Sequence, residues 1–211
     1  MIIDCISDLH GYFPKMEGGD LLIVAGDICG LHGDRDLIFF ADWISKQKYK
    51  KKVVIAGNHD VALEEFGQTL FNCINFDYLC DTGTEFEGLK MWGSPWTHQF
   101  SGINPHCKAF TGSYENDSLK EKWELIPKDT DILITHCPPY NILDTTKYNE
   151  HVGDVYLLDT IIQVKPFLHV FGHVHECGGM YIQMPDDIQY INASHMNEYY
   201  EPIHKPVRVI L

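Results

Sequence analysis

One stretch of this chain, VVIAGNHD at residues 53–60, joins an apolar run of strand-forming residues to a glycine and three polar side chains. Short runs rich in Val, Ile and Leu indicate strands that are buried on both faces of a helix-covered sheet. Similar runs occur along the rest of the chain, at residues 2–6, 21–25, 132–134 and 167–171. The sequence therefore predicts five buried strands that lead into polar segments.

The segments between these runs predict helices and additional strands. Three of them have helical character: residues 34–46, 116–125 and 154–164. A hairpin that turns near Glu87-Gly88 is expected over residues 84–94, and further strands over residues 180–184, 188–192 and 207–211. Because no internal repeat or Ser/Gly linker interrupts this mixed α/β pattern, we expect a single domain over residues 1–211.

The composition excludes several classes of protein. The 211 residues carry a formal net charge of −14 and have only two arginines, Arg35 and Arg208, which disfavours nucleic-acid polymers and anionic membrane surfaces as partners. No apolar run approaches the ~18–20 residues that span a bilayer, and the first ten residues have no basic segment typical of a signal peptide. The seven cysteines are odd in number and include no CxxC pair, so we expect free thiols and a cytoplasmic protein.

Each of the five buried runs leads into side chains that can bind metal ions. These residues are Asp8, His10, Asp27, Asn58, His59, Asp60, His136, His173 and His175. In an open α/β sheet the functional crevice lies outside the carboxyl ends of the strands, so we expect these side chains to meet. Residues two apart on an extended segment point the same way, which pairs Asp8 with His10 and His173 with His175.

The chemistry of this set predicts a metal centre. Imidazole, carboxylate and amide ligands without thiolate suit Zn, Fe, Mn, Ni or Co, with Mg also open, better than Ca or a structural zinc site. Even seven of these nine side chains, without His59 and Asp60, are too many ligands for one four-coordinate ion. Two divalent or trivalent ions roughly 3.5–4 Å apart that share a carboxylate would use them all and could clamp a phosphoryl oxygen.

The order of these residues resembles the signature of the calcineurin-like metallophosphoesterase superfamily. That signature, D-x-H, G-D, G-N-H-D, H and G-H-x-H, is matched in order by residues 8–10, 26–27, 57–60, 136 and 172–175. Residues 93–96, 131–139, 165–173 and 191–194 are similar to the branch of metallophosphoesterase-domain-containing proteins and class III cyclic nucleotide phosphodiesterases. The resemblance implies a sandwich of two mixed β-sheets flanked by helices.

The resemblance also implies a role for each motif residue. The first ion would be bound by Asp8, His10, Asp27 and His175, and the second by Asp27 as a bridge with Asn58, His136 and His173. His59 would contact the substrate, Asp60 would orient His59, and a bridging hydroxide would attack phosphorus. The expected activity is hydrolysis of phosphodiester or phosphomonoester bonds in small substrates, including cyclic and other nucleotides.

Two departures from relatives qualify this interpretation. Ser/Thr phosphoprotein phosphatases carry GDxVDRG and GNHE, whereas this chain has GDICG at residues 26–30 and GNHD at residues 57–60, without the phosphate-binding arginines. A protein phosphatase is therefore disfavoured. Cys137 stands where relatives of the closer branch carry glycine, and its thiol, like that of Cys29, could be open to oxidation. A non-catalytic metal-binding interaction scaffold and a nuclease remain as alternatives.

Substrate contacts are predicted in two long polar segments, residues 97–116 and 140–153. The candidate substrate contacts are His59, His151, Trp96 and Tyr140. Further aromatic residues that could stack on a base are Phe100, Phe110 and Tyr148. Ordinary packing is the alternative for these aromatic side chains. The lysine-rich residues 48–52 are expected to form a solvated helix end.

Overall fold

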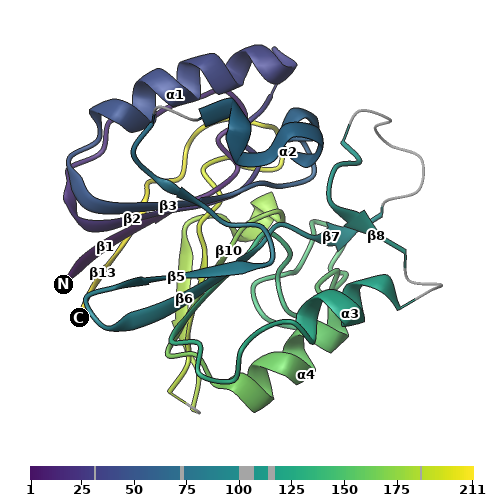
Figure 1. Cartoon of the computed structure of the whole chain (residues 1–211). Helices are drawn as coiled ribbons and strands as arrows, with labels where there is room; N and C mark the ends of the chain where they lie inside the picture. Colours follow the sequence, from purple (N-terminus) through teal and green to yellow (C-terminus); the bar gives the residue numbers. More distant parts are fainter. Residues whose placement is uncertain (31, 72–73, 100–106, 114–116, 186) are drawn as a thin grey trace.

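Two β-sheets face each other in the middle of this molecule, and helices cover the outer face of each sheet (Figure 1). The architecture comes from a computed structural model that describes residues 1–30, 32–71, 74–99, 107–113, 117–185 and 187–211. The predicted sandwich of two mixed sheets with flanking helices is confirmed.

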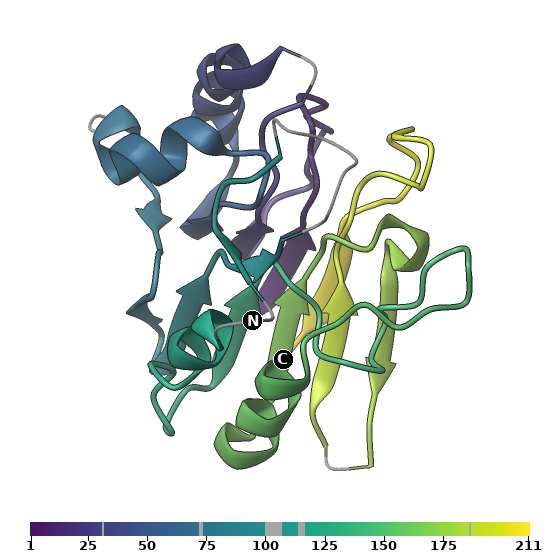
Figure 2. The ribbon, with the colours of Figure 1, turned by 90° about the vertical axis from the view of Figure 1, so that its right-hand side faces the viewer.

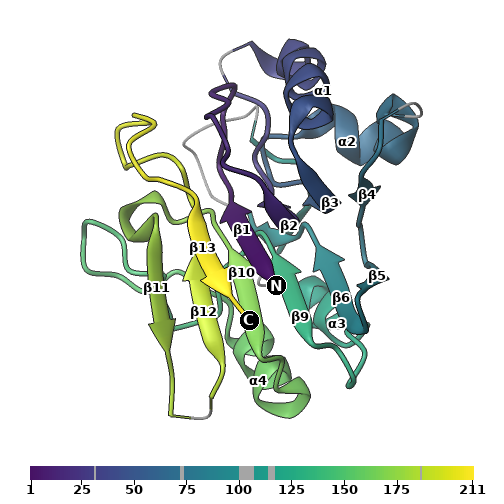
Figure 3. The same cartoon turned by 90° about the vertical axis from the view of Figure 1, so that its left-hand side faces the viewer.

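The first sheet contains the first three predicted strands. Its order is β13 (Val207–Ile210), β1 (Ile2–Ile6), β2 (Gly19–Ala25), β3 (Tyr49–Ile55) and β4 (Asp77–Tyr78). Strands β1 to β4 are parallel, and β13 is antiparallel to β1. The parallel arrangement brings the carboxyl ends of β1, β2 and β3 to one edge (Figure 3).

The second sheet contains the other two predicted buried strands. Its order is β11 (Met180–Gln183), β12 (Gln189–Asn192), β10 (Leu168–Phe171), β9 (Ile132–Thr135), β6 (Leu89–Ser94) and β5 (Thr82–Phe86). The four middle strands are parallel, and the two edge strands are antiparallel to their neighbours. A small parallel pair, β7 (Thr97–His98) and β8 (Thr111–Gly112), lies outside both sheets.

Helices cover the outer faces of the sandwich. Helices α1 (Asp36–Lys46) and α2 (Val61–Phe66) lie over the first sheet, and α3 (Ser118–Trp123) and α4 (Val155–Val164) lie over the second (Figure 1). The described residues also form the short 3-10 helices η1 (Gly33–Arg35), η2 (Gly67–Phe71) and η4 (His175–Cys177). Within the described part of the chain, no helix has the length and apolarity that crossing a membrane requires.

The alternation of side chains along the strands explains why the apolar runs are continuous. In β1, Ile3 and Cys5 enter the core between the two sheets, whereas Ile6 enters the core under α1. A third core joins the second sheet to α3 and α4. Both faces of the central strands are therefore buried, and each fully buried aliphatic side chain contributes roughly 1.5–3 kcal/mol.

One expectation about local structure is wrong. Most of the lysine-rich run belongs to β3 rather than to a solvated helix end, because this segment pairs with β2 from Gly19 onward. The run is accommodated by partners along the strand: Lys52 is buried and donates a hydrogen bond to the carbonyl of Ile44 at 2.9 Å, and Lys51 pairs with Asp77 at 2.6 Å.

Candidate metal centre

The carboxyl ends of β1, β2, β3, β9 and β10 converge, and the side chains that follow them form one connected cluster. Among the described residues, three sets have ligand atoms that lie within 4.8 Å of one another. They are Asp8, His10 and His175; His10, Asp27 and His59; and Asp27, His136 and His173. Because the sets share His10 and Asp27, they form a single centre.

The backbone at this centre is held in an uncommon conformation. Asp8, His10, Asp27 and His173 have φ angles of 52°, 44°, 52° and 70°, in the left-handed region that non-glycine residues rarely adopt. The turns are hydrogen-bonded to each other, since the amide of Asp8 donates to Gly26 and that of His10 donates to Asp27. Such strain persists where the surrounding structure enforces it, and it is concentrated at functional sites.

Glycines allow the chain to approach the two carboxylates. A Cβ added at Gly172 would lie 2.1 Å from Oδ2 of Asp8, and one added at Gly57 would lie 2.3 Å from Oδ1 of Asp27. Neither position has room for a side chain. The glycines that precede the motif residues are therefore required by close packing around the carboxylates.

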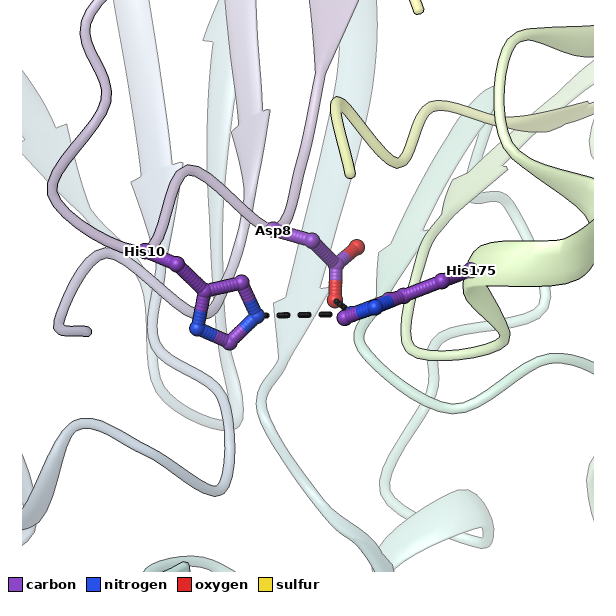
Figure 4. Close-up of side chains that lie close together, drawn as sticks. All are labelled: Asp8, His10 and His175. Atoms are coloured by element: carbon purple, nitrogen blue, oxygen red, sulfur yellow. Dashed lines mark hydrogen bonds and ion pairs between the residues drawn. The ribbon is translucent and has the colours of Figure 1, made fainter. Parts of the chain in front are cut away.

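The first group of ligands is Asp8, His10 and His175 (Figure 4). Nδ1 of His10 lies 3.1 Å from the carbonyl of Cys29, and Nδ1 of His175 lies 3.2 Å from the carbonyl of Asn197. Because a carbonyl only accepts, each Nδ1 carries a proton, and Nε2 is the nitrogen left to face a metal ion. The two Nε2 atoms are 3.3 Å apart, and Oδ1 of Asp8 is 3.2 Å from that of His175. Three ligand atoms that converge in this way fit a cation.

The second group is built in the same way around His136. Its Nδ1 donates to the carbonyl of Ala25 at 2.9 Å, so Nε2 is the nitrogen left to face a metal ion. That Nε2 is 3.1 Å from Oδ1 of Asn58 and 3.3 Å from Oδ2 of Asp27. His173 completes the group and donates its backbone N–H to the Asp8 carboxylate.

Asp27 lies between the two groups. Its Oδ2 is 3.7 Å from Nε2 of His10 and 3.3 Å from Nε2 of His136, while its Oδ1 accepts a hydrogen bond from the amide of His59. One carboxylate oxygen therefore adjoins both sets of ligand nitrogens. The residues fit a metal centre with nitrogen and oxygen ligands in which Asp27 is shared.

Charge and burial shift the pKa values of the groups at this centre in both directions. Burial opposes ionisation of Asp8 and Asp27, but the neighbouring His175 and His136 hold both pKa values below the usual range. Burial lowers the pKa of His10 and of His173 to about 3, so both rings are neutral. The pKa values of His136 and His175 move the other way: burial opposes this shift, but the carboxylates of Asp27 and Asp8 raise both, that of His136 to about 9. These two rings therefore release a proton when a metal binds, because a metal requires neutral imidazole ligands.

A cavity of about 460 Å³ lies over this centre. Asp27, Asn58, His59 and His173 line it beside the ligand groups, and further walls come from residues near 146–152, 174–176 and 198–200. The volume is within the range of small-molecule sites. His59 lines this cavity, with Nε2 3.9 Å from Oδ2 of Asp27, and the substrate contact expected of it stays a prediction.

The structure corrects the predicted role of Asp60. Its buried carboxylate accepts hydrogen bonds from the amides of Ile28, Cys29 and Gly57, at 3.2, 2.8 and 2.8 Å. It therefore joins the turns after β2 and β3 and does not orient the His59 ring. The ring is contacted instead by Cys107, whose Sγ lies 3.2 Å from Nδ1 of His59. Three nearby backbone donors outweigh one imidazole as partners for a buried carboxylate.

Three of the residues predicted to contact substrate lie away from this cavity: Trp96, Tyr140 and His151 are not among the described residues that line it. The indole N–H of Trp96 donates to Asp81 at 2.9 Å. Nδ1 of His151 lies 2.7 Å from Asp144, and the Tyr140 ring packs against His151 with 5.7 Å between ring centroids. Their partners within the loops account for these residues.

Two of the other aromatic candidates can be placed. Phe110 is buried, Tyr148 lines the cavity, and Phe100 lies outside the described residues. Sequence reasoning missed Tyr200 and Cys107, which also line the cavity but belong to none of the motifs. Burial raises the pKa of the thiols of Cys29 and Cys137 far above the ordinary value, so neither is a reactive thiolate.

The convergence of histidines and carboxylates at the strand ends of a two-sheet sandwich defines a class of proteins with a candidate metal centre at the edge of the sheets. Residues 1–177 match the model of the family described as calcineurin-like phosphoesterase. The chain belongs to this family.

Individual comparisons agree with this assignment. The chain is similar to metallophosphoesterase domain-containing protein 1 of Homo sapiens, with 34% identity over 238 residues that cover 98% of this chain and 70% of the relative. Two solved structures share the fold. The protein TT1561 of Thermus thermophilus has a TM-score of 0.59 and 16% identity, and the match covers 90% of this chain and 88% of that protein. A putative 5'-nucleotidase from Staphylococcus aureus has a TM-score of 0.57 and 12% identity, with 99% and 53% covered.

Proposed function

We propose that this protein is a dinuclear metal-dependent phosphoesterase that hydrolyses small phosphodiesters, with phosphomonoesters as the second class and nucleotides among the candidate substrates. The observation that carries this proposal is the position of Asp27, whose Oδ2 adjoins the ring nitrogens of His10 and His136. A carboxylate shared by two sets of ligand nitrogens is the arrangement that two adjacent cations require.

The side chains divide the work of such a reaction. Two divalent ions, when bound, would supply positive charge to a phosphoryl oxygen and activate the attacking water. His59 faces the cavity, and no described acidic side chain holds its ring at hydrogen-bond distance, so its imidazole can donate a proton to the leaving oxygen. The backbone carbonyls that accept from His10, His136 and His175 keep the ligand nitrogens directed inward.

The charges at the cavity support a monoanionic diester over a protein phosphoester. Both arginines lie elsewhere: Arg208 pairs with Asp4 and Glu17, and Arg35 belongs to η1. Among the described residues that line the cavity, Lys147 is the one lysine, and three glutamates accompany it. A site without a guanidinium binds a group with a second negative charge less readily.

Metal analysis combined with turnover tests this proposal. The purified protein is loaded with Mn, Ni, Co, Zn or Mg, the ions per chain are counted, and bis-p-nitrophenyl phosphate and p-nitrophenyl phosphate are compared as substrates. We expect about two ions per chain and faster turnover of the diester. Two ions with no turnover of either ester would support an interaction scaffold, and the absence of bound metal would overturn the proposal. Digestion of single-stranded or double-stranded DNA at low salt would support a nuclease instead.

A further inference from the structure

Two tyrosines stand at the cavity with their rings exposed. Tyr148 lies in the loop between β9 and α4 and is 74% exposed, and Tyr200 lies between β12 and β13 and is 52% exposed. Both line the cavity over the metal centre. A large ring left in water forgoes the free energy of burial, and exposed aromatic residues at a pocket are typical of ligand sites.

The ring of Tyr200 is held in place beside the ligand groups. Its centroid lies 5.0 Å from that of His10, 4.9 Å from that of His175 and 6.4 Å from that of His59. The backbone is also constrained, since Tyr200 has a φ of 60°. Its position is therefore set before any ligand arrives.

Asn197 organises the turn that carries Tyr200. Its side-chain oxygen accepts from the amides of Tyr199 and Glu201 at 3.0 and 2.9 Å, and its carbonyl accepts from the amide of Tyr200. The same carbonyl accepts from Nδ1 of the metal-centre residue His175. The backbone carbonyl of Asn197 thus holds both the turn of Tyr200 and the ring of His175.

The loop that carries Tyr148 is hydrogen-bonded to Glu176, the residue after His175. The amide of Lys147 donates to Oε1 of Glu176 at 3.0 Å, and Glu176 directly follows His175. Within the loop, the amides of Tyr148 and Asn149 donate to Thr146. Both tyrosine-bearing segments are therefore hydrogen-bonded to residues of η4, the Tyr148 loop through Glu176 and the Tyr200 turn through His175. Figure 2 shows both segments near this short helix.

We propose that Tyr148 and Tyr200 form a binding subsite for a planar aromatic group of the substrate, such as an aryl or heteroaryl ring. This inference rests on the proposed phosphoesterase function, because the phosphoryl group would lie over the metal centre and direct its ester group toward the tyrosines. An aromatic side chain can stack on planar rings of many chemical types, but the partner has to be flat. The carboxylates of Glu150, Glu176 and Glu198 line the same cavity and favour a group without further negative charge.

Two diesters with the same leaving group test the subsite. Bis-p-nitrophenyl phosphate and methyl p-nitrophenyl phosphate differ only in the group that stays on phosphorus. We expect the wild type to prefer the aryl diester in kcat/KM, and Tyr200→Leu to reduce that preference about 5- to 100-fold, chiefly through KM. Tyr148→Leu should act in the same direction. Tyr200→Phe should keep the preference, and so should the control Tyr199→Leu, whose ring is 71% exposed but does not line the cavity.

A binding measurement separates this inference from the proposed function. Phenylphosphonate and methylphosphonate carry C–P bonds that a phosphoesterase does not hydrolyse, so their affinities for the manganese-loaded protein can be compared by calorimetry. We expect tighter binding of phenylphosphonate, lost in Tyr200→Leu. An inactive wild type with this preference would refute the phosphoesterase but retain the subsite. An active wild type whose preference survives both leucine variants, or is lost equally in Tyr200→Phe, would refute the subsite.

Discussion

Two buried clusters of this molecule contain aspartates and histidines, but their contacts differ. In the metal centre, Oδ2 of Asp27 faces ring nitrogens of His10, His59 and His136 at 3.3 to 3.9 Å. In the second cluster, here called the loop cluster (Asp144, His151, Asp154 and His98), each carboxylate faces one histidine at 2.7 Å.

The remaining carboxylate contacts of the loop cluster are made by ordinary donors. Oδ2 of Asp144 accepts from the amides of Asn141 and Gly153, and Oδ1 of Asp154 accepts from the amide of Leu157 and the indole of Trp123. Each carboxylate of the loop cluster has one histidine and nearby N–H donors around it, whereas ring nitrogens of three histidines converge on Asp27 in the metal centre. The residue types alone therefore do not distinguish a metal site from a structural one.

The largest expected effect comes from Asp27→Asn in the metal centre. An amide cannot supply the shared negative charge, so we expect fewer ions per chain and a loss of turnover of about a thousandfold or more. Metal analysis and the diester assay measure both. The matched variant Asp144→Asn should keep the metal content of the wild type. Equal metal loss in the two variants would remove the distinction between the clusters.

His59→Gln should affect chemistry without affecting metal content. Loss of a proton donor at the leaving oxygen would lower kcat about 10²- to 10⁴-fold, while the ions per chain stay the same. The loop-cluster variant His151→Gln provides the control and should keep its kcat. A His59→Gln protein with wild-type turnover on both p-nitrophenyl esters would show that this ring takes no part in the reaction.

Asp154→Asn should affect stability rather than metal content. The change removes the negative charge of a buried carboxylate that lies 2.7 Å from Nε2 of His98, and we expect a loss of roughly 3 kcal/mol of unfolding free energy. Urea unfolding of the metal-free protein measures this loss, and metal titration of the folded variant should still reach the wild-type stoichiometry. A variant with normal stability and reduced metal binding would reverse the roles of the two clusters.

The smallest expected effect is a pH dependence at His169, which belongs to neither cluster. Burial lowers its pKa from 6.5 to about 3. The unfolded chain therefore takes up a proton before the folded one, so stability is full above pH 6.5 and falls as the pH drops, by up to about 1.4 kcal/mol per unit. His169→Gln should show a shallower loss between pH 6.5 and 5 in urea unfolding with chelator present. Identical slopes would contradict this assignment.

Local sequence was sufficient for the five central strands, apart from the start of β3, and for naming the side chains that meet at their ends. Apolar runs and the polar residues at their ends are short-range patterns, and parallel strands bring such ends to one edge by geometry. His10 and His175 are separated by 165 positions, yet the motif order placed both at the centre. The substrate side was less accessible, because aromatic loop residues such as Trp96 and Tyr140 show no pattern that tells a packed ring from one facing a cavity.

The partners of individual side chains depend on how distant segments meet. Asp60 directly follows His59 in sequence, but the folded chain offers it amides of the turn after β2, and it binds those. Tyr200 reaches the histidines of the metal centre because the carbonyl of Asn197 accepts from His175. A buried polar group binds whichever donors the packed structure brings within reach, and that selection is made by tertiary contacts rather than by neighbours along the chain.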